Sequence, residues 1–391
     1  MPVINRIAEF HADMTVWRHD LHANPEIGLQ EHRTSRVVQE RLRTFGVDEV
    51  VTGLAQTGVV GVIRGRGTGG RAIGLRADMD ALPIEEATGK PYASRNPGVM
   101  HACGHDGHTT MLLGAARYLA ETRNFDGTVY VIFQPAEENA GGGEIMVREG
   151  LFERFPMDQV FGLHNWPGLP QGQFAWRDGP IMAAVGGIDI TITGKGAHAA
   201  HPDVGIDPIV VASQIVTALQ TIVSRSLNPA DSGVVTIGHI SAGHASNVIP
   251  ETAHMTGTAR WFAPHVGDAL EAGVRRLATG IAASFGASAE VAFTRTYPAT
   301  VNDPDATALT VAAARAVAGD ARVQPMQRPT MGAEDFAYML QKKQGSYIML
   351  GAARGADDAL LHHARYDFND EILPIGASYW ATLAEQVLSG T

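Results

Sequence analysis

Cysteine is almost absent from this chain of 391 residues, in which Cys103 is the only one. A single cysteine cannot form an internal disulfide, so the fold must be held by its core, which suits a reducing compartment. No run of Lys or Arg occurs, and acidic residues outnumber basic ones 41 to 30, which disfavours nucleic acid as a partner. No apolar run approaches the roughly 18–20 residues that span a bilayer, and no signal peptide is visible. We therefore expect a soluble, cytoplasmic protein without nucleic-acid or membrane partners.

What is present is an ordinary globular composition, with 45% hydrophobic and 18% charged residues, which excludes a disordered chain, a coiled coil and a collagen-like repeat. The length favours two domains over one. Helices over 31–45 and 107–121 alternate with apolar strands over 58–64, 71–77, 127–133 and 159–164, the first two strands being joined by a Gly-rich turn. This alternation predicts an α/β layer with its chemistry on loops past the strand ends.

The middle of the chain has a different order of elements. Strands over 185–193, 233–240, 252–262 and 288–297 and helices over 207–225 and 266–285 follow one another as β-α-β-β-α-β, a ferredoxin-like unit. The end of the chain again shows the helix and strand alternation of the first part, with a strand over 346–351 and a helix over 376–388. We therefore expect an α/β catalytic domain formed by residues 1–184 and 295–391, with residues 185–294 inserted as a second domain.

A cluster of metal-ligating residue types begins at His101. Cys103, His105 and His108 follow within eight residues on a Gly-containing loop before a helix. A thiolate and an imidazole two residues apart can face one ion, and this ligand pair suits Zn²⁺ and similar transition metals. Asp106 could accept a hydrogen bond from a ligating His, and the preceding Asp78 and Asp80 could hold either such a His or a metal ion.

Further candidate ligands follow other strands. Glu137 and Glu138 are adjacent at a strand end and point to different sides, so one could bind metal while the other acts as general base. A lone Glu-Glu pair is more often a solvated helix start, but here it belongs to the same sheet as the Cys-His cluster. His164 follows another strand, and one of a late His pair, His362 or His363, completes the set. Five ligands exceed one tetrahedral site and suit two neighbouring ions.

The inserted domain carries polar candidates of another kind. His198 lies on a Gly-rich loop that lacks the spacing of a phosphate-binding P-loop. Asn247 and Arg260 lie on the same domain, and such groups can stabilise an oxyanion or pair with a carboxylate. Ordinary strand polarity explains each of the three taken alone. Glu334 and Asp335 stand at a predicted helix start, where capping explains them.

Eight strings occur in one order along the chain: RADMDALP, MHACGHDGHT, FQPAEE, GLHNWP, GKGAHAA, NVIP, GAEDF and LHHARYDFND. Together they resemble the amidohydrolases that include hippurate hydrolase, plant auxin-conjugate hydrolases, aminoacylase-like enzymes and carboxypeptidase G relatives. The resemblance implies a di-metal exopeptidase-like catalytic domain with a smaller lid domain that forms a homodimer. It assigns the metal ligands as Cys103, His105, Glu138, His164 and His362, and it makes Glu137 the catalytic base.

The resemblance also gives roles to the lid. His198 matches a His that reaches the scissile carbonyl, often from the partner subunit, while Asn247 and Arg260 match positions that contact the substrate carboxylate or the carbonyl oxygen. The chain departs from its relatives at two places. His201 and Asp203 follow the lid loop, and His363 beside His362 leaves the choice of the late ligand open.

The predicted activity is metal-dependent hydrolysis of the amide bond of N-acyl or N-aroyl amino acids, giving a carboxylic acid and an amino acid. Zn²⁺ or Mn²⁺ is the expected ion, and Co²⁺ or Ni²⁺ also suits the ligands. One alternative is a dipeptidase or carboxypeptidase that acts on small peptides with the same site. Another is a non-catalytic protein that binds metal or a small molecule in the same pocket.

Overall fold

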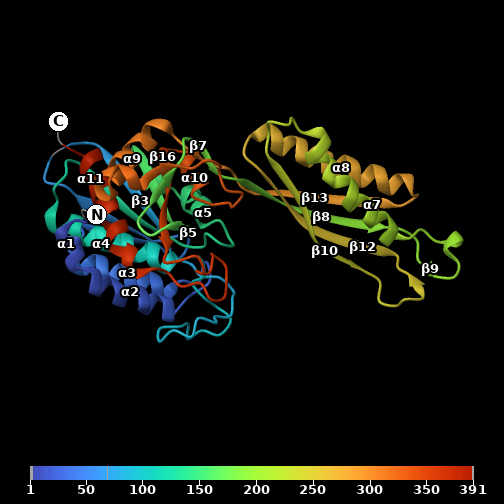
Figure 1. Ribbon diagram of the computed structural model, residues 1–391, viewed down its shortest axis with the longest axis horizontal. Helices are drawn as coiled ribbons and strands as arrows, with labels where there is room; N and C mark the ends of the chain where they lie inside the picture. The colour runs from blue at the N-terminus through green and yellow to red at the C-terminus, as the bar shows by residue number, and fades with distance from the viewer. Residues whose placement is uncertain (1–2, 68, 390–391) are drawn as a thin grey trace. The chain divides into compact units, whose positions relative to one another are not determined.

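The computed structural model describes residues 3–67 and 69–389, which divide into two compact units (Figure 1). The first unit comprises Met1–Ile181, Thr300–Pro329 and Asp335–Thr391. The second comprises Met182–Ala299 and Thr330–Glu334. The second unit thus begins three residues before and ends five residues after the predicted inserted domain of 185–294, and the short segment 330–334 belongs to it as well.

An eight-stranded mixed sheet forms the centre of the first unit, in the order β1-β2-β4-β3-β5-β16-β6-β15. Its strands are Glu49–Leu54 (β1), Gly58–Arg64 (β2), Ala72–Asp78 (β3), Thr128–Gln134 (β4), Gln159–Pro170 (β5), Phe174–Trp176 (β6), Val323–Pro325 (β15) and Gln344–Ala353 (β16). The four neighbours β4, β3, β5 and β16 are parallel, so their carboxyl ends meet at one edge. That edge carries the candidate site.

Helices cover this sheet. The longest is His105–Thr122 (α4), which packs against His11–Ala23 (α2), Leu373–Val387 (α11) and β3, and almost all of its residues are buried. Pro304–Ala318 (α9) packs against α11. The other helices of the unit are Asn5–Glu9 (α1), His32–Thr44 (α3), Gly142–Arg148 (α5), Leu151–Arg154 (α6) and Ala337–Leu340 (α10). The predicted α/β layer is confirmed.

The strands at 58–64 and 71–77 were expected as consecutive strands joined by a turn. They are present as β2 and β3, but they are not neighbours in the sheet, because β4 lies between them. Phe133 of β4 is paired with Val59 on one side and with Ala77 on the other. The apolar β4 can pair along both edges, so the neighbours of each strand are decided by packing of the whole sheet rather than by the local turn.

The second unit contains a four-stranded antiparallel sheet in the order β10-β12-β8-β13. Its strands are Ala184–Thr193 (β8), Gly233–Ala242 (β10), Thr252–Trp261 (β12) and Ser288–Tyr297 (β13), and its long helices are Pro208–Thr221 (α7) and Pro264–Ser284 (α8). A small sheet pairs Ala197–His198 (β9) with Val248–Ile249 (β11). This βαββαβ succession and strand order are those of a ferredoxin-like unit.

One helix in this unit runs against the expectation that no apolar stretch approaches membrane-spanning length. Pro208–Ser226, which is α7 with the π-helical turn Ile222–Ser226 (η2), has the length and composition of a membrane-crossing helix. It buries Val211, Ile215 and Leu219 in the core of the unit. Core helices of soluble proteins pass the same test, so the segment alone assigns no membrane location.

Candidate metal centre

The candidate site gathers at the carboxyl ends of the parallel strands in the first unit. Asp78 ends β3 and is followed by Asp80, while Gln134 ends β4 and leads to Glu137 and Glu138. His164 lies on β5, the next strand of the sheet. Parallel strands bring these chain-distant residues to one edge, as the strand pattern predicted.

Five side chains with metal-ligating atoms converge there. Cys103 Sγ lies 3.4 Å from His164 Nε2, and His362 Nε2 lies 3.3 Å from Glu138 Oε1. His105 Nε2 lies 3.9 Å from the same Glu138 oxygen. Two three-residue groups, each with its ligand atoms within 4.8 Å of one another, share the thiol: Cys103 with His105 and His164, and Cys103 with Glu138 and His362. Glu137 lies within the same distance of His105 and Glu138.

Unpartnered polar atoms show that this set fits a cation. Within residues 3–67 and 69–389, His105 Nε2 and Glu138 Oε1 are buried and have no hydrogen-bond partner. Burying such atoms without a partner is costly, and a divalent ion between them would satisfy both. Thiolate, imidazole and carboxylate together suit a borderline transition ion better than Mg²⁺ or Ca²⁺.

Gly104 allows Cys103 and His105 to face the same point. Its φ is +89°, a left-handed conformation that L side chains rarely adopt. A Cβ there would lie 2.4 Å from Asn165 Nδ2 and 2.6 Å from the Tyr366 hydroxyl. Asn165 Nδ2 donates to the carbonyl oxygen of Cys103 (2.7 Å), and Tyr366 donates to Asn165 Oδ1 (2.6 Å). The Cys-Gly-His loop is thus fixed by buried hydrogen bonds.

Acceptors outside the ligand set orient the imidazoles. Asp80 Oδ1 lies 3.2 Å from His105 Nδ1, and Asp80 Oδ2 accepts from the Glu138 backbone N–H (2.9 Å). His164 Nδ1 donates to the Asn165 carbonyl oxygen (2.6 Å), which leaves its Nε2 toward Cys103. The expectation for Asp106 was wrong: it lies 2.8 Å from Nδ1 of His22, which is outside the ligand set. Asp106 follows His105 directly in α4, where successive side chains point about 100° apart, and it turns toward His22 of α2.

The charges around the site also indicate a cation. Burial raises the pKa of the Cys103 thiol well above its usual value, and the nearby Glu138 and Glu137 raise it further. Burial alone would lower the pKa of His105, but Asp78 and Asp80 raise it to about 10. Burial holds the pKa of His164 well below its usual range. A bound divalent ion would offset the carboxylates and favour the thiolate.

A buried ion-pair network supports the strand ends and was missed from the sequence. Arg76 on β3 donates to Asp78 (2.7 Å), to Asp335 (2.9 Å) and to Gln134 (2.8 Å). Asp335 also accepts from the Gly143 backbone N–H in α5 (2.7 Å), so it was wrong to explain Asp335 by capping of its own helix. The signal was available, because an arginine inside an apolar strand needs carboxylate partners.

His108, a member of the Cys-His cluster, is not one of the five candidate ligands, although its ligand atom lies within 4.8 Å of those of Asp78 and His105. Its Nδ1 lies 2.6 Å from Asp78 Oδ1, and its Nε2 accepts from the Asn165 backbone N–H (2.9 Å). These two contacts fix a neutral imidazole with the proton on Nδ1. His101 is buried and has no hydrogen-bond partner for either ring nitrogen in the part of the chain that the structure describes.

Comparison with known proteins agrees with this geometry. The profile of the peptidase family M20/M25/M40 matches residues 74–386. The chain belongs to this family. It is 40% identical over 388 residues to hippurate hydrolase of Campylobacter jejuni, covering 99% of this chain and 100% of that protein. It is 38% identical over 374 residues to thermostable carboxypeptidase 2 of Saccharolobus solfataricus, covering 94% and 93%.

Among solved structures, the YXEP protein of Bacillus subtilis, described as a dinuclear metal binding peptidase from the M20 family, superposes with a TM-score of 0.82. It is 36% identical and the match covers 98% of this chain and 100% of that one. The predicted metal-dependent amidohydrolase family and its fold are therefore confirmed. Family membership makes the M20 chain an enzyme that acts on amide bonds, which sets aside the non-catalytic alternative.

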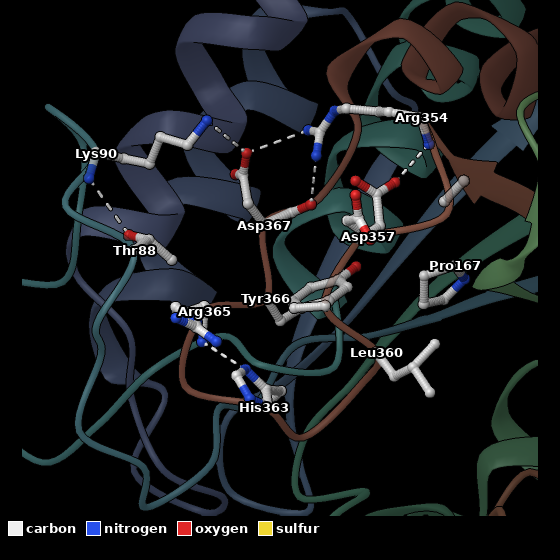
Figure 2. A pocket seen from close by; sticks show the side chains of 13 residues that line it. Thr88, Lys90, Pro167, Arg354, Asp357, Leu360, His363, Arg365, Tyr366 and Asp367 are labelled. Carbon is white, nitrogen blue, oxygen red and sulfur yellow. Dashed lines mark hydrogen bonds and ion pairs between the residues drawn. The ribbon is translucent and has the colours of Figure 1, made fainter.

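The two late histidines of the M20 chain have different surroundings. His362, in a left-handed backbone conformation (φ 62°), turns its Nε2 to Glu138, and this nearby carboxylate raises the pKa of His362. His363 instead lines a hollow of about 640 Å³ (Figure 2). Lys90 and Arg354 in that hollow both contact Asp367, each at 3.1 Å, while His363 Nδ1 accepts from the Arg365 backbone N–H (3.0 Å).

The candidates of the second unit lie at two ends of its sheet. His198 is exposed on β9, where it is paired with Val248, and the Ala199 N–H donates to the Asn247 carbonyl oxygen (3.0 Å). Arg260 is near the end of β12, where burial lowers its pKa and it donates to the Met331 carbonyl oxygen (3.4 Å).

Only His198 and Asn247 are therefore brought together. Thr252, which begins β12, follows β11 closely, and Arg260 lies eight residues farther along the strand. At about 3.4 Å per residue these eight residues extend about 27 Å. Arg260 therefore lies about 27 Å from the end of β12 that follows the small β9–β11 sheet.

Proposed function

We propose that this M20 enzyme hydrolyses the amide bond of N-acyl or N-aroyl amino acids, releasing a carboxylic acid and an amino acid. The observation that carries the proposal is the convergence of five candidate ligands with a sixth group, Glu137, whose carboxylate lies within 4.8 Å of the ligand atoms of His105 and Glu138 and can act as a base. Glu137 has 6% of its surface exposed, so it is largely shielded from bulk water but still accessible to a small molecule. The full-length identity with hippurate hydrolase supports a small acylated amino acid as substrate.

Cys103, His105, Glu138, His164 and His362 would hold two divalent ions, with Zn²⁺ or Mn²⁺ favoured and Co²⁺ or Ni²⁺ also suited. Bound ions would supply Lewis-acid activation of water and of the substrate carbonyl. Glu137 would take the proton of the attacking water and deliver it to the leaving amide nitrogen. Asp80 would keep His105 and Glu138 oriented during this transfer.

The second unit would act as a lid that recognises the substrate. His198 and Asn247 would donate to the oxygen that becomes negative in the transition state, and Arg260 would pair with the substrate carboxylate. The separation of about 27 Å along β12 supports a homodimer, because one small substrate can meet both His198 and Arg260 only if they come from two subunits. Such a dimer through the lid is part of the proposal.

Peptide hydrolysis is the second candidate, favoured by the identity with thermostable carboxypeptidase 2. The ligand set serves either substrate, since both reactions cleave an amide next to a carboxylate. Assays of hippurate, N-acetyl amino acids and dipeptides on the same metal-reconstituted protein separate the two. A cytoplasmic location is also proposed, because a Cys103 thiolate would be open to oxidation whenever the metal is absent.

Replacing Glu137 by Gln tests the mechanism. The variant keeps size and hydrogen bonding but cannot take a proton, so we expect kcat on the best substrate to fall by at least about 1000-fold with metal content unchanged. The matched control is Glu138→Gln next to it, which should lose metal as well as activity. Near wild-type turnover by Glu137→Gln would refute the assigned base.

A further inference from the structure

A buried carboxylate reaches the catalytic loop from a distant part of the chain. Glu31, at the start of α3, is fully buried. Its Oε1 accepts from the Ala136 backbone N–H (2.9 Å), and its Oε2 accepts from the Thr57 hydroxyl (2.6 Å). Ala136 immediately precedes Glu137. Glu31 is therefore bonded to the backbone immediately before the Glu137–Glu138 pair.

Ala136 has a strained backbone. Its φ is +55°, a left-handed conformation that is unfavourable for any residue with a Cβ, and it is fully buried. Such strain persists only where the surroundings hold it, and it concentrates at functional sites. Here the N–H is held by Glu31, and the carbonyl oxygen accepts from the Gly142 N–H (3.0 Å).

The segment that carries Glu31 also lies directly against Ala136, and this close approach depends on Gly28, which has no side chain. A Cβ on Gly28 would lie 2.8 Å from the Ala136 Cα and 2.9 Å from its Cβ. Among residues 3–67 and 69–389, six non-glycine residues have positive φ, and one of them is Ala136 itself. Three others lie within two residues of Glu31 or of its partner Thr57 in the chain: Leu29, Ala55 and Gln56. The Glu31 carboxylate thus lies among three segments that each contain residues with positive φ: 28–31, 55–57 and the loop at Ala136.

The same segment contacts the second loop of the site. The Ala81 N–H donates to the Glu26 carbonyl oxygen (2.9 Å), and Ile27 forms a parallel bridge with Ala81. Ala81 follows Asp80, whose carboxylate accepts from the Glu138 N–H. Residues 26–31 therefore brace both the Asp80 loop and the Glu137 loop.

We propose that Glu31 is a positioning residue, which aims the Glu137 and Glu138 carboxylates by holding the Ala136 peptide in its left-handed conformation. The inference rests on the roles proposed above for these two residues. Without the Glu31 bond, the Ala136 N–H would be buried without a partner and the peptide would relax toward an ordinary φ. That rotation would redirect the chain that carries both carboxylates.

The test compares Glu31→Ala with Glu31→Gln, whose side-chain oxygen can still accept from Ala136. For Glu31→Ala loaded with Co²⁺ we expect kcat to fall about 10–100-fold with KM within about threefold, and the visible Co²⁺ spectrum to change. Amide hydrogen exchange of the metal-free protein should accelerate across residues 134–140. Glu31→Gln should restore kcat, spectrum and exchange to near wild type.

Two further variants separate positioning from mere stability. Thr57→Val removes the other bond to Glu31 but leaves Ala136 held, so it should lower the melting temperature while kcat stays within about threefold. Gly28→Ala keeps Glu31 but displaces Ala136, so it should repeat the kcat and Co²⁺ effects of Glu31→Ala.

Wild-type kcat and an unchanged Co²⁺ spectrum in folded Glu31→Ala would overturn the proposal, as would an equal kcat loss in Thr57→Val. If the wild-type enzyme hydrolysed none of the acylated substrates, the proposed function would fail. The spectrum and the hydrogen exchange would still decide the role of Glu31.

Discussion

The two units of the molecule organise their functional residues in opposite ways. In the first, five ligating side chains and Glu137 converge within a few Å, and backbone and carboxylate contacts orient most of them. In the second, His198 is exposed on a small two-stranded sheet, Asn247 is exposed in the turn just before that sheet's second strand, and Arg260 is near the end of β12. The first arrangement suits chemistry that needs fixed geometry, and the second suits recognition of a substrate that arrives later.

This difference predicts how each region responds to substitution. Residues of a preassembled buried site depend on one another, so removing one should disable the whole site. Replacing a residue that acts only when substrate is bound should remove that residue's contribution to catalysis or substrate binding and leave metal binding unchanged. The following experiments test this contrast, beginning with the largest expected effect.

Cys103→Ala should abolish metal binding and activity together. The thiol belongs to both three-residue groups, so its removal weakens both ion sites at once. The fold should survive because Ala fits the space of the small buried thiol, which circular dichroism and a thermal melt of the metal-free protein would show. Metal content measured by elemental analysis is the direct readout. A Cys103→Ala protein that binds two ions and turns over substrate would show that the site is not shared in this way.

His198→Ala should lower kcat about 100-fold by removing an oxyanion donor, and Arg260→Ala should chiefly raise KM. Both variants should keep their full metal content. Co-expressing the two variants should restore up to about a quarter of the wild-type rate, because a mixed dimer holds one site with both residues intact. Activity of the mixture equal to the sum of the separate variants would contradict sharing of the site between subunits.

His362→Ala should reduce metal affinity about 10–100-fold, whereas His363→Ala should leave it unchanged. His362 faces Glu138, while His363 lines the hollow beside it. The pair is a matched comparison, because the same residue is removed at adjacent positions. Zn²⁺ or Co²⁺ titration of the two metal-free variants measures the difference, and the reverse ranking would make His363 the late ligand.

The smallest effect concerns pH and stability rather than turnover. Burial raises the pKa of Glu31 from 4.5 to about 7, so the folded protein binds this proton more tightly than the unfolded chain does. The free energy of unfolding should therefore fall as pH rises from about 4.5 to 7, by about 2–3 kcal/mol for this group. Glu31→Gln should lack this decline, which urea unfolding of the metal-free proteins at several pH values would measure. Parallel pH curves for the two proteins would contradict the buried titration.

The sequence predicted those parts of the molecule that local patterns determine. Apolar strands followed by acidic or histidine residues identified the edge of the sheet where the candidate ligands lie, and the β-α-β-β-α-β succession identified the second sheet. The late ligand could not be chosen between His362 and His363, because only the backbone at that loop decides which ring turns toward Glu138.

Contacts between residues far apart in the chain also could not be predicted from the sequence. Asp106 contacts His22, and Glu31 reaches Ala136 across more than a hundred residues. The position of β4 between β2 and β3 likewise depends on the whole sheet. These contacts join segments far apart in the chain, and no spacing within either segment encodes them.

We propose that the first unit holds a two-ion centre on which amide hydrolysis depends. The most direct test is to titrate the metal-free enzyme with Co²⁺ while recording hippurate hydrolysis and the thiolate-to-metal absorption band together. The account predicts that activity and absorption rise together and level off at about two ions per chain, with both lost in Cys103→Ala. Full hydrolysis by the metal-free enzyme, or saturation with metal that brings no turnover of any acylated amino acid or dipeptide, would contradict it.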